Sequence, residues 1–508
     1  MNEEEYKLLC EACDNVLLAP DSTVESGAIP WLHVVREHPV FLDNYLDIIE
    51  SAKGAKVIGR RWLRFLRSRA WWFRQLGRAL CSDGQLWFGP KELPRQIDVL
   101  FVSHLINASH AGQEDDFYFG ELPNELAKQG QSVVVTLINY SCEPAAYLAC
   151  KWKGSRVQRV VLSVSLRIFD EVLLRMRLKK ESLRLRGIAK NEAPGLAQRV
   201  LARAAEEALS GSSQTTLRMA TQIGALVAKL QPKVIVVTHE GHAWERVAFA
   251  TARSVHPNVR CIGYQHAAVF RLQHAIRRNL EREYNPDNIL TAGIVSKAQL
   301  ERAPGLIGIP ISVLGSNRNY KRGKTSHRMH ADREVHSDSR ACLVLPEGIT
   351  SECHLLFEFS LLCALANPEI QFIWRLHPIV SFESLTAQNR KLRNLPGNIL
   401  VSQSTLEEDI TRSCWALYRG TTAIVQAVTA GICPIYLMLP GELTIDPLYE
   451  VEGWRAKVAT ILDLENLINN TGRYDDAEFK TQLIESEMWM AKKYCEDFFM
   501  PFNVNTLL

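Results

Sequence analysis

The sequence predicts an α/β protein with two doubly wound parallel-sheet domains and an N-terminal helical extension. Short apolar runs alternate with helical stretches across residues 94–316 and again across residues 341–480, which is the pattern of βαβ units. Residues 317–340 between them are polar and highly charged and indicate a linker. Polar clusters follow the apolar runs, where the carboxyl ends of parallel strands meet and ligands bind. With 508 residues, the chain is long enough for two or three domains.

The expected strands are short apolar runs bounded by polar, glycine or proline residues. In the first domain they are Ile97–Ser103, Ser132–Ile138, Lys233–Thr238, Arg260–Tyr264, Asn288–Thr291 and Ile311–Leu314, with a mostly helical stretch at 160–230. In the second domain they are Ala341–Leu345, Ile370–Trp374, Asn398–Val401, Cys414–Tyr418 and Cys433–Leu437. A long helix over Ala477–Tyr494 follows, and we expect the terminal segment, 481–508, to return to the first domain.

Residues 1–93 form a predicted helical accessory region, and its most distinctive part is Lys56–Arg78, with eight Lys or Arg and no acid. At about 100° per residue, arginines gather on one side of this helix and aromatic and aliphatic residues on the other. That pattern is typical of a helix on an anionic membrane, where arginines meet head groups and aromatic rings enter the boundary layer. The alternative is an amphipathic helix docked on the protein's own core. The expected membrane-docking residues are Arg60, Arg64, Arg67, Trp71, Trp72 and Arg74.

The composition narrows the class of function. Net charge is 59 − 56 = +3, so it gives no sign of nucleic-acid binding. The 12 Cys show no combined His/Cys spacing of a metal site, which favours reduced cytosolic thiols. The start is acidic and no apolar run is long enough for a signal peptide or a membrane span. We therefore expect a cytoplasmic protein, with peripheral attachment to the inner membrane through the basic helix.

Two stretches carry the strongest signal of a ligand site, Trp374–Pro378 and Tyr418–Thr422. In each, an apolar strand ends in polar side chains, and in the second Gly420 permits a sharp turn before a helix. A strand, a tight turn and a helix start with free N–H groups favour a phosphate. The sequence has no GxGxxG after its first strand and no GxxxxGK[ST], so it gives no sign of a standard dinucleotide site or a P-loop.

These motifs resemble GT-B glycosyltransferases, which have two Rossmann-like domains around a cleft. More narrowly, they resemble bacterial surface-polysaccharide enzymes with cytidine-nucleotide donors, the sialyl-, polysialyl- and Kdo-transferases, and more distantly the teichoic-acid glycerophosphotransferases. The matching residues are Glu240-Gly241 for an acidic-acidic-Gly triplet, His377-Pro378 for a His-Pro pair and Thr421-Thr422 for a Ser/Thr pair. His239 stands where the family pattern has its leading acid. The resemblance covers residues 97–500.

The resemblance implies a role for each motif. Glu240 would be the general base or the nucleophile of glycosyl transfer, although a Glu there could also cap the helix Trp244–Ser254. His377 would donate to the donor phosphate as negative charge develops, or be a structural histidine at a strand end. Thr421 and Thr422 would hold the phosphate or cap their helix, and both roles can hold together. The expected donor-binding residues are Arg375, Pro378, Glu347, Gly348, Arg419, Gly420, Thr421 and Thr422, and the expected acceptor or cleft residues are His239, His242, Gln265, His266 and Asp116.

By resemblance, the protein would move an acidic nonulosonic or ulosonic sugar from a CMP donor onto a bacterial surface glycan. Its partners would be the nucleotide sugar, a glycan or lipid-linked glycan acceptor and an anionic membrane surface. No DxD motif stands at a strand end, so we expect no essential metal, and no cofactor besides the nucleotide-sugar co-substrate. Two alternatives stay open: a UDP-sugar enzyme on the same fold, either a transferase or a 2-epimerase, and a non-catalytic subunit of a glycan-assembly complex.

Overall fold

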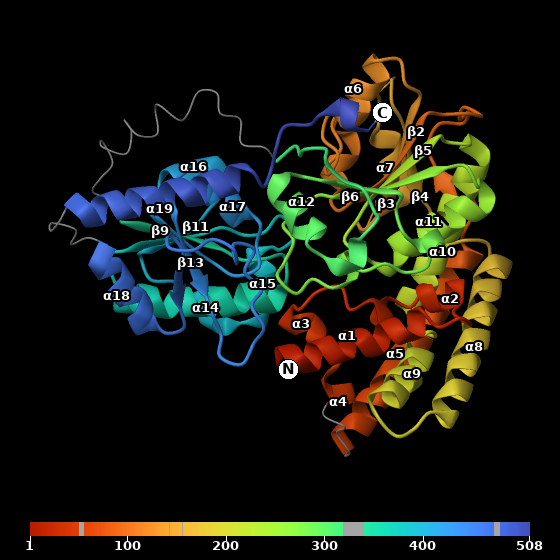
Figure 1. Ribbon diagram of the computed structural model, residues 1–508, viewed down its shortest axis with the longest axis horizontal. Helices are drawn as coiled ribbons and strands as arrows, with labels where there is room; N and C mark the ends of the chain where they lie inside the picture. The colour runs from red at the N-terminus through yellow and green to blue at the C-terminus, as the bar shows by residue number, and fades with distance from the viewer. Residues whose placement is uncertain (50–54, 142, 155, 319–339, 472–477, 508) are drawn as a thin grey trace.

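The computed structural model describes residues 1–49, 55–141, 143–154, 156–318, 340–471 and 478–507. The predicted linker, 317–340, lies outside the described residues except at its two ends. Figure 1 shows two sheets, each with helices on both faces, and the N-terminal helices beside the first sheet. The predicted α/β class with two parallel-sheet domains and an N-terminal helical extension is confirmed.

The first domain is built on an eight-stranded sheet. Its elements are β1 (Trp87–Phe88), β2 (Val99–Leu105), α6 (Leu122–Lys128), β3 (Val133–Asn139), α7 (Ala145–Lys151), β4 (Gln158–Leu162), α10 (Gly211–Leu230), β5 (Val234–Thr238), α11 (Ala243–Val255), β6 (Arg260–Gln265), β7 (Asn288–Thr291), α12 (Ile294–Glu301) and β8 (Ile311–Val313). The strand order is β1-β4-β3-β2-β5-β6-β7-β8, parallel throughout except for β1 against β4. The central strands are almost wholly apolar because α10 and α11 cover one face and α6 and α7 the other.

The second domain is built on a six-stranded, fully parallel sheet. Its elements are β9 (Ala341–Leu345), α14 (Thr350–Ala366), β10 (Gln371–Trp374), α15 (Phe382–Gln388), β11 (Ile399–Val401), α16 (Leu406–Thr411), β12 (Trp415–Tyr418), α17 (Ala423–Thr429), β13 (Cys433–Leu437), β14 (Ala456–Val458), α18 (Ile461–Thr471) and α19 (Glu478–Glu496). The strand order is β11-β10-β9-β12-β13-β14. α14 and α18 cover one face, and α17 and α19 cover the other.

In both sheets, the order in which the chain adds strands reverses at one point. In the first, the chain runs outward from β2 through β3 and β4 and then places β5 on the other side of β2; in the second, β9 and β12 have the same relation. Loops that leave neighbouring strands on opposite sides of such a point open a crevice, and ligands of doubly wound sheets bind there. The two crevices are therefore the places where site residues are expected.

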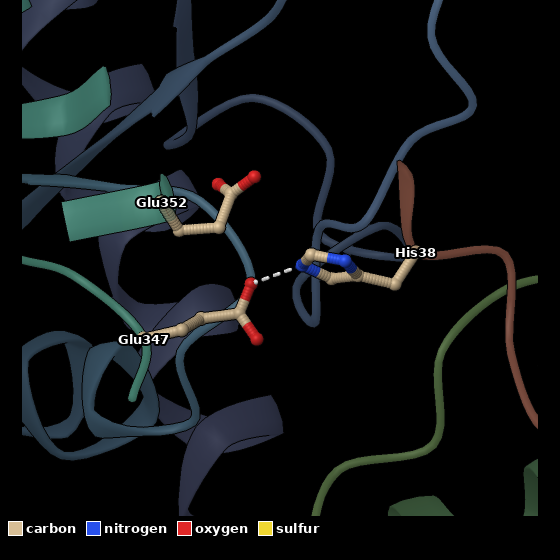
Figure 2. A group of neighbouring side chains, drawn as sticks. All are labelled: His38, Glu347 and Glu352. Carbon is tan, nitrogen blue, oxygen red and sulfur yellow. Dashed lines mark hydrogen bonds and ion pairs between the residues drawn. The ribbon is translucent and has the colours of Figure 1, made fainter. Parts of the chain in front are cut away.

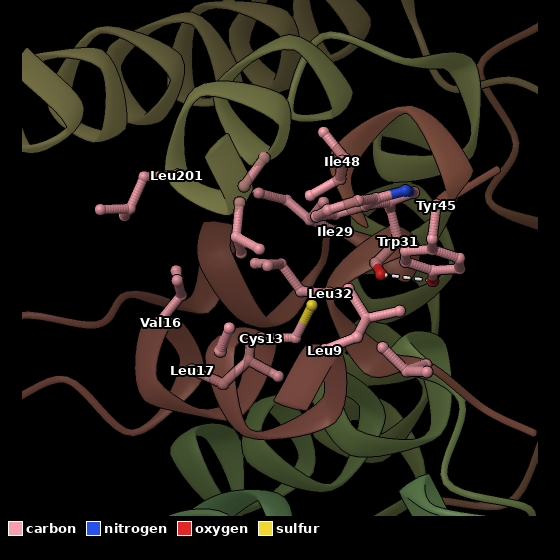
Figure 3. Close-up of a cluster of buried hydrophobic side chains, with 14 of the residues drawn as sticks. Leu9, Cys13, Val16, Leu17, Ile29, Trp31, Leu32, Tyr45, Ile48 and Leu201 are labelled. Atoms are coloured by element: carbon pink, nitrogen blue, oxygen red, sulfur yellow. Dashed lines mark hydrogen bonds between the residues drawn. The ribbon is translucent and has the colours of Figure 1, made fainter. Parts of the chain in front are cut away.

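The N-terminal region has its own hydrophobic core. It comprises α1 (Glu3–Leu17), α2 (Val24–Gly27), α3 (Pro39–Leu42), α4 (Leu46–Ile49) and α5 (Ala55–Leu80), together with α8 (Ile168–Asn191) and α9 (Leu196–Glu207) from the first domain. α1 begins with a capping box between Asn2 and Glu5. Leu9 and Cys13 of α1 and Leu201 of α9 belong to one buried cluster, shown in Figure 3, where Tyr45 donates a hydrogen bond of 2.7 Å to the Trp31 carbonyl.

The C-terminal segment leaves α19 and reaches the first domain. Met500 N donates to Ala292 O at 2.9 Å, and Asn503 N donates to Leu314 O at 2.7 Å. Gly315 has φ +99°, and a Cβ there would lie 2.1 Å from Pro501 O, so this crossing requires glycine. Phe498 joins a core that contains residues of both domains. The chain end thus links the two domains.

Three short strands lie outside the sequence prediction: β1, β4 and β14. β4 falls at the start of the stretch that we expected to be mostly helical, and the rest of that stretch does form α8, α9 and α10. β4 starts with Gln158 and Arg159, and it is only five residues long. Its pairing with β3 and β1, rather than its own apolar pattern, makes it a strand.

Candidate functional site

A cavity of about 250 Å³ opens between the two domains at the carboxyl edge of the second sheet. Phe117 and Arg318 line it from the first domain, and Arg375, His377, Thr421 and Thr422 line it from the second. The second-domain residues follow β10 and β12, the strands on either side of β9. The structure thus brings together His377 and four of the residues that the sequence predicted for donor binding, Arg375, Pro378, Thr421 and Thr422.

His377 presents a hydrogen-bond donor to this cavity. Ile379 N donates to His377 Nδ1 at 3.4 Å, which makes Nδ1 the acceptor and places the ring proton on Nε2. Burial lowers the pKa of His377, with the charge of Arg318 acting in the same direction. The imidazole is therefore neutral at pH 7. Gly348 lies under the ring, where a Cβ would come within 2.8 Å of Nδ1.

The two threonines behave differently from each other. Thr421 Oγ1 accepts from Ala423 N at 3.4 Å, so it closes the first turn of α17. Thr422, the N-cap residue, makes no such bond, and its hydroxyl accepts instead from Arg318 Nη1 at 3.3 Å. The capping alternative therefore describes Thr421 but not Thr422. Gln426 donates to the carbonyl of Arg318 at 3.5 Å and holds this arginine at the cavity.

Arg375 is fixed at the cavity wall by Asp409. Its Nη1 donates to Asp409 Oδ2 at 2.8 Å and to Ser404 O at 2.7 Å. Asp409 is fully buried and also accepts from Ser402 and pairs with Arg412. Because two arginines share this carboxylate, Arg375 keeps part of its positive charge available to a ligand.

Behind the cavity, Glu347 joins the second domain to the N-terminal region, as Figure 2 shows. His38 Nε2 lies 3.0 Å from Glu347 Oε1, and Arg36 Nη2 donates to Oε2 at 3.3 Å. Gly420 makes room for this carboxylate, since a Cβ there would lie 2.1 Å from Oε1. Burial raises the pKa of Glu347, but the His38 bond and the Arg36 charge outweigh it and lower the pKa overall.

His38, Glu347 and Glu352 bring metal-ligand atoms within 4.8 Å of one another in the described part of the chain. Their carboxylates already have cationic partners, because Arg36 pairs with Glu347 and Arg419 lies 2.8 Å from Glu352 Oε2. Arg419 also pairs with Glu442 at 2.7 Å, so it faces this network and not the cavity. Two guanidinium groups supply the positive charge that a metal ion would bring, and we interpret the cluster as an ion-pair network between domains.

Glu240 follows β5 in the first domain, and its side chain is 30% exposed. Glu245 holds its loop, accepting hydrogen bonds at 2.9, 2.8 and 3.0 Å from the backbone N–H groups of Glu240, Gly241 and His242. Gly241 has φ +87°, and a Cβ there would lie 2.3 Å from the Ala275 carbonyl carbon. The capping role that the sequence left open for Glu240 belongs to Glu245, so the Glu240 carboxylate is available for chemistry.

Glu240 and His242 form a pair, with His242 Nε2 3.4 Å from Glu240 Oε2. Burial raises the pKa of Glu240, but the His242 hydrogen bond and the charges of His266, His242 and Arg36 outweigh it, and the pKa falls well below its usual range. Burial lowers the pKa of His242, but its bond to Glu240 and the nearby carboxylates outweigh burial and raise it. Glu240 is therefore ionised at neutral pH.

Three residues expected in the acceptor cleft have structural roles instead. His239 is fully buried below Gly263, with Nδ1 3.0 Å from Glu245 Oε2. Asp116 is buried and accepts from Ser103 Oγ at 2.8 Å and from the N–H groups of Tyr118 and Phe119, each at 2.9 Å, as a turn-forming aspartate does. Gln265 is buried and donates to the Ala267 carbonyl. These three side chains are thus held by contacts within the first domain.

His266 belongs to an aromatic group near Glu240. Its ring contacts Tyr118 with centroids 4.5 Å apart, and His104 contacts Tyr118, Tyr140 and Trp244 at 5.5, 5.3 and 5.0 Å. Burial lowers the pKa of His266 to about 4, so this ring is neutral. A neutral aromatic surface beside a carboxylate suits a sugar ring, which offers both apolar C–H faces and hydroxyl groups.

Two arginines stand between the candidate residues of the two domains. Arg36 pairs with Glu347, and its charge also acts on Glu240 and His242. Arg318 bonds Thr422, and its charge acts on both His266 and His377. These two arginines therefore act electrostatically on candidate residues of both domains.

The residues that sequence reasoning missed come from segments assigned to other roles. Arg318 falls at the edge of the predicted linker, and Arg36 and His38 fall in the predicted accessory region. His38-Pro39 repeats the His-Pro pair of His377-Pro378, but His256-Pro257 does so too, and the repeat therefore does not mark the segment as part of a site.

The predicted membrane-docking set on α5 divides into two groups. Arg60, Arg67 and Arg74 are exposed. Arg64 pairs with Asp47 at 3.2 Å, and Trp71 and Trp72 face the protein, with Arg218 and Arg175 over their rings at 5.8 and 5.4 Å. Those three residues hold α5 in place. In the described part of the chain, no helix is long and apolar enough to cross a bilayer.

Neither a family model nor a curated protein matches this sequence. Among solved structures it is similar to a putative UDP-N-acetylglucosamine 2-epimerase from Listeria monocytogenes (12% identity, TM-score 0.46, covering 81% of this chain and 94% of that chain). It is also similar to the glycotransferase of kitacinnamycin (13%, TM-score 0.44, 79% and 95%) and to the glycosyltransferase SnogD from Streptomyces nogalater (12%, TM-score 0.42, 81% and 97%). Likenesses this distant assign neither a substrate nor a reaction to the chain.

Proposed function

We propose that the protein is a glycosyltransferase that binds a nucleotide sugar against its second domain and transfers the sugar to an acceptor hydroxyl near Glu240. The observation that carries this proposal is the interdomain cavity, where a neutral His377 N–H, the Thr422 hydroxyl and two guanidinium groups converge. These are phosphate-binding groups. The ionised Glu240 and its partner His242 occupy the facing domain.

In the proposed reaction, the bond between the anomeric carbon and the donor phosphate oxygen breaks, and the acceptor oxygen bonds to that carbon. His377 Nε2–H and Arg318 stabilise the negative charge that develops on the leaving phosphate. The acceptor proton passes to the Glu240–His242 pair. An efficient general base has a pKa near the working pH. The raised pKa of His242 therefore suits this imidazole to take the proton, while Glu240 orients it and stabilises its charged form.

For the donor, we propose an acidic sugar linked to CMP. Arg318 forms no ion pair within the described part of the chain, and Arg375 shares its carboxylate with Arg412. Incompletely neutralised arginines favour a ligand with more than one negative group, and such a donor has a phosphate and a sugar carboxylate. A UDP-sugar brings two phosphates and satisfies the same charges, so a UDP-sugar transferase or 2-epimerase is the second candidate. The acceptor we propose is a surface glycan, free or lipid-linked.

A donor panel separates these candidates. CMP-, CDP-, UDP- and GDP-sugars are each added to the protein, and the melting temperature and donor hydrolysis are measured. We expect CMP-sugars to give the largest shift in melting temperature. A bound ligand raises the melting temperature because, at 100 times its Kd, it stabilises the fold by about 2.7 kcal/mol.

A larger shift with UDP-sugars would move the proposal to the second candidate, and release of an epimerised sugar without acceptor would identify an isomerase. No shift with any nucleotide would contradict the proposed donor site. It would favour the alternative of a non-catalytic assembly subunit.

A further inference from the structure

α5 exposes large apolar side chains on a helix that is firmly attached to the protein. Trp62 is 61% exposed, Leu66 57%, Phe73 68% and Leu80 70%. Attachment uses a different face, where Gln75 is buried and donates to Glu171 at 3.0 Å and Ser68 bonds the Leu209 carbonyl. Monomeric proteins rarely expose contiguous apolar side chains of this size without a partner.

The neighbouring helix α8 extends the same surface. Arg175 of α8 donates to Ser68 of α5 at 3.5 Å and lies over the Trp72 ring at 5.4 Å, so the two helices are adjacent. Next to this contact, α8 exposes Phe169 at 84%, Leu173 at 56% and Met176 at 62%. Their spacing of three or four residues puts them on one side of the helix. The two exposed stripes together form what we call the α5–α8 surface.

The α5–α8 surface is also strongly basic. Arg60, Arg67 and Arg74 of α5 are exposed and make no ion pair within the described residues, and the same is true of Lys179 and Lys180 of α8. The described part of α5 contains no acidic residue at all. Since the whole chain has a net charge of only +3, this concentration is local.

We infer that the α5–α8 surface docks on an anionic lipid bilayer. Aromatic and aliphatic side chains would enter the head-group boundary, while the arginines on the adjoining side of α5 meet lipid phosphates. A second copy of this chain is a poorer occupant, because face-to-face pairing would bring two basic surfaces together. The inference goes beyond the proposed transfer reaction and does not depend on it.

The test is co-sedimentation of the full chain with vesicles of phosphatidylcholine alone or of phosphatidylcholine mixed with phosphatidylglycerol. We expect binding to the mixed vesicles, weakened by added salt because salt screens charges. The triple variant Arg60→Gln, Arg67→Gln, Arg74→Gln should lose about a hundredfold in partitioning, at about tenfold per 1.4 kcal/mol and about 1 kcal/mol per basic residue. The variant Trp62→Ser, Phe65→Ser, Phe73→Ser should lose binding by a similar factor.

Trp489→Ser is the matched control, because Trp489 is 65% exposed but lies on α19 of the second domain, far from α5 in Figure 1. It should bind as the unchanged protein does. All replaced residues are exposed, and unchanged melting temperatures would show that the variants fold. Equal binding to both vesicle types, or full binding by either triple variant, would overturn the inference. So would a concentration-dependent doubling of mass that the aromatic variant abolishes, since the surface would then be a protein interface.

Discussion

His377→Ala lowers kcat for sugar transfer by about 10²–10³-fold, the range for removing one preorganised donor to a developing negative charge. The physical reason is that His377 lines the cavity with Nε2–H as its free donor, because Nδ1 accepts from the Ile379 N–H. Donor affinity changes less, since Arg318, Arg375 and Thr422 remain. Steady-state kinetics with a saturating acceptor give kcat and the KM for the donor separately.

His354→Ala provides the control for this variant. His354 is also half-buried in the second domain, but it lies on α14 and does not line the cavity. Its kcat should match that of the unchanged protein. If His377→Ala transfers sugar at the normal rate while it stays folded, His377 is a structural histidine and the assignment of the leaving-group site fails.

Glu240→Gln lowers kcat by about 10²–10⁴-fold, as loss of a positioned acid–base group does. Gln keeps the size of the side chain and leaves Glu245 to hold the loop, so the melting temperature should change little. Nucleotide binding should also persist, because the proposed phosphate-binding groups of His377, Thr422, Arg318 and Arg375 are unchanged. Asp115→Asn is the control, an exposed acid after β2 that should leave transfer unchanged.

The pH profile separates the roles of Glu240 and His242. The negative charge of Glu240 raises the pKa of His242, so its removal lowers that pKa. If neutral His242 takes the acceptor proton, the acid limb of kcat/KM in Glu240→Gln moves to lower pH. An acid limb that stays in place would exclude His242 as the base, whereas loss of the limb would identify Glu240 itself as the group that titrates.

Local signals were sufficient to predict the parallel sheets and the ends of β5, β9, β10 and β12. Each of these strands is an apolar run buried on both faces, and each is followed by a polar turn, so sequence pattern and tertiary environment agree. Because the ends of β10 and β12 were predicted correctly, the sequence also placed His377 and Thr422 at one site, although they are about forty residues apart in the chain.

The rest depended on contacts between distant segments. His38 and Arg36 reach Glu347 across more than 300 residues, and nothing in their local pattern specifies that partner. The choice between Glu240 and Glu245 as the cap also required the fold, because either carboxylate stands at the start of α11. For α5, helical periodicity placed arginines and aromatics on opposite sides, whereas packing exposes both kinds together and buries a third face.

The central claim is that one nucleotide phosphate binds between His377 and Thr422, opposite Glu240. A crystal structure of the full chain with the nucleotide that most raises its melting temperature tests this claim most directly. We predict a phosphate oxygen within hydrogen-bond distance of His377 Nε2 and the Thr422 hydroxyl, with the Glu240 carboxylate on the facing wall. A phosphate bound instead in the outer basic pocket of the first domain, beside Arg253, Arg260 and Arg282, would contradict the claim.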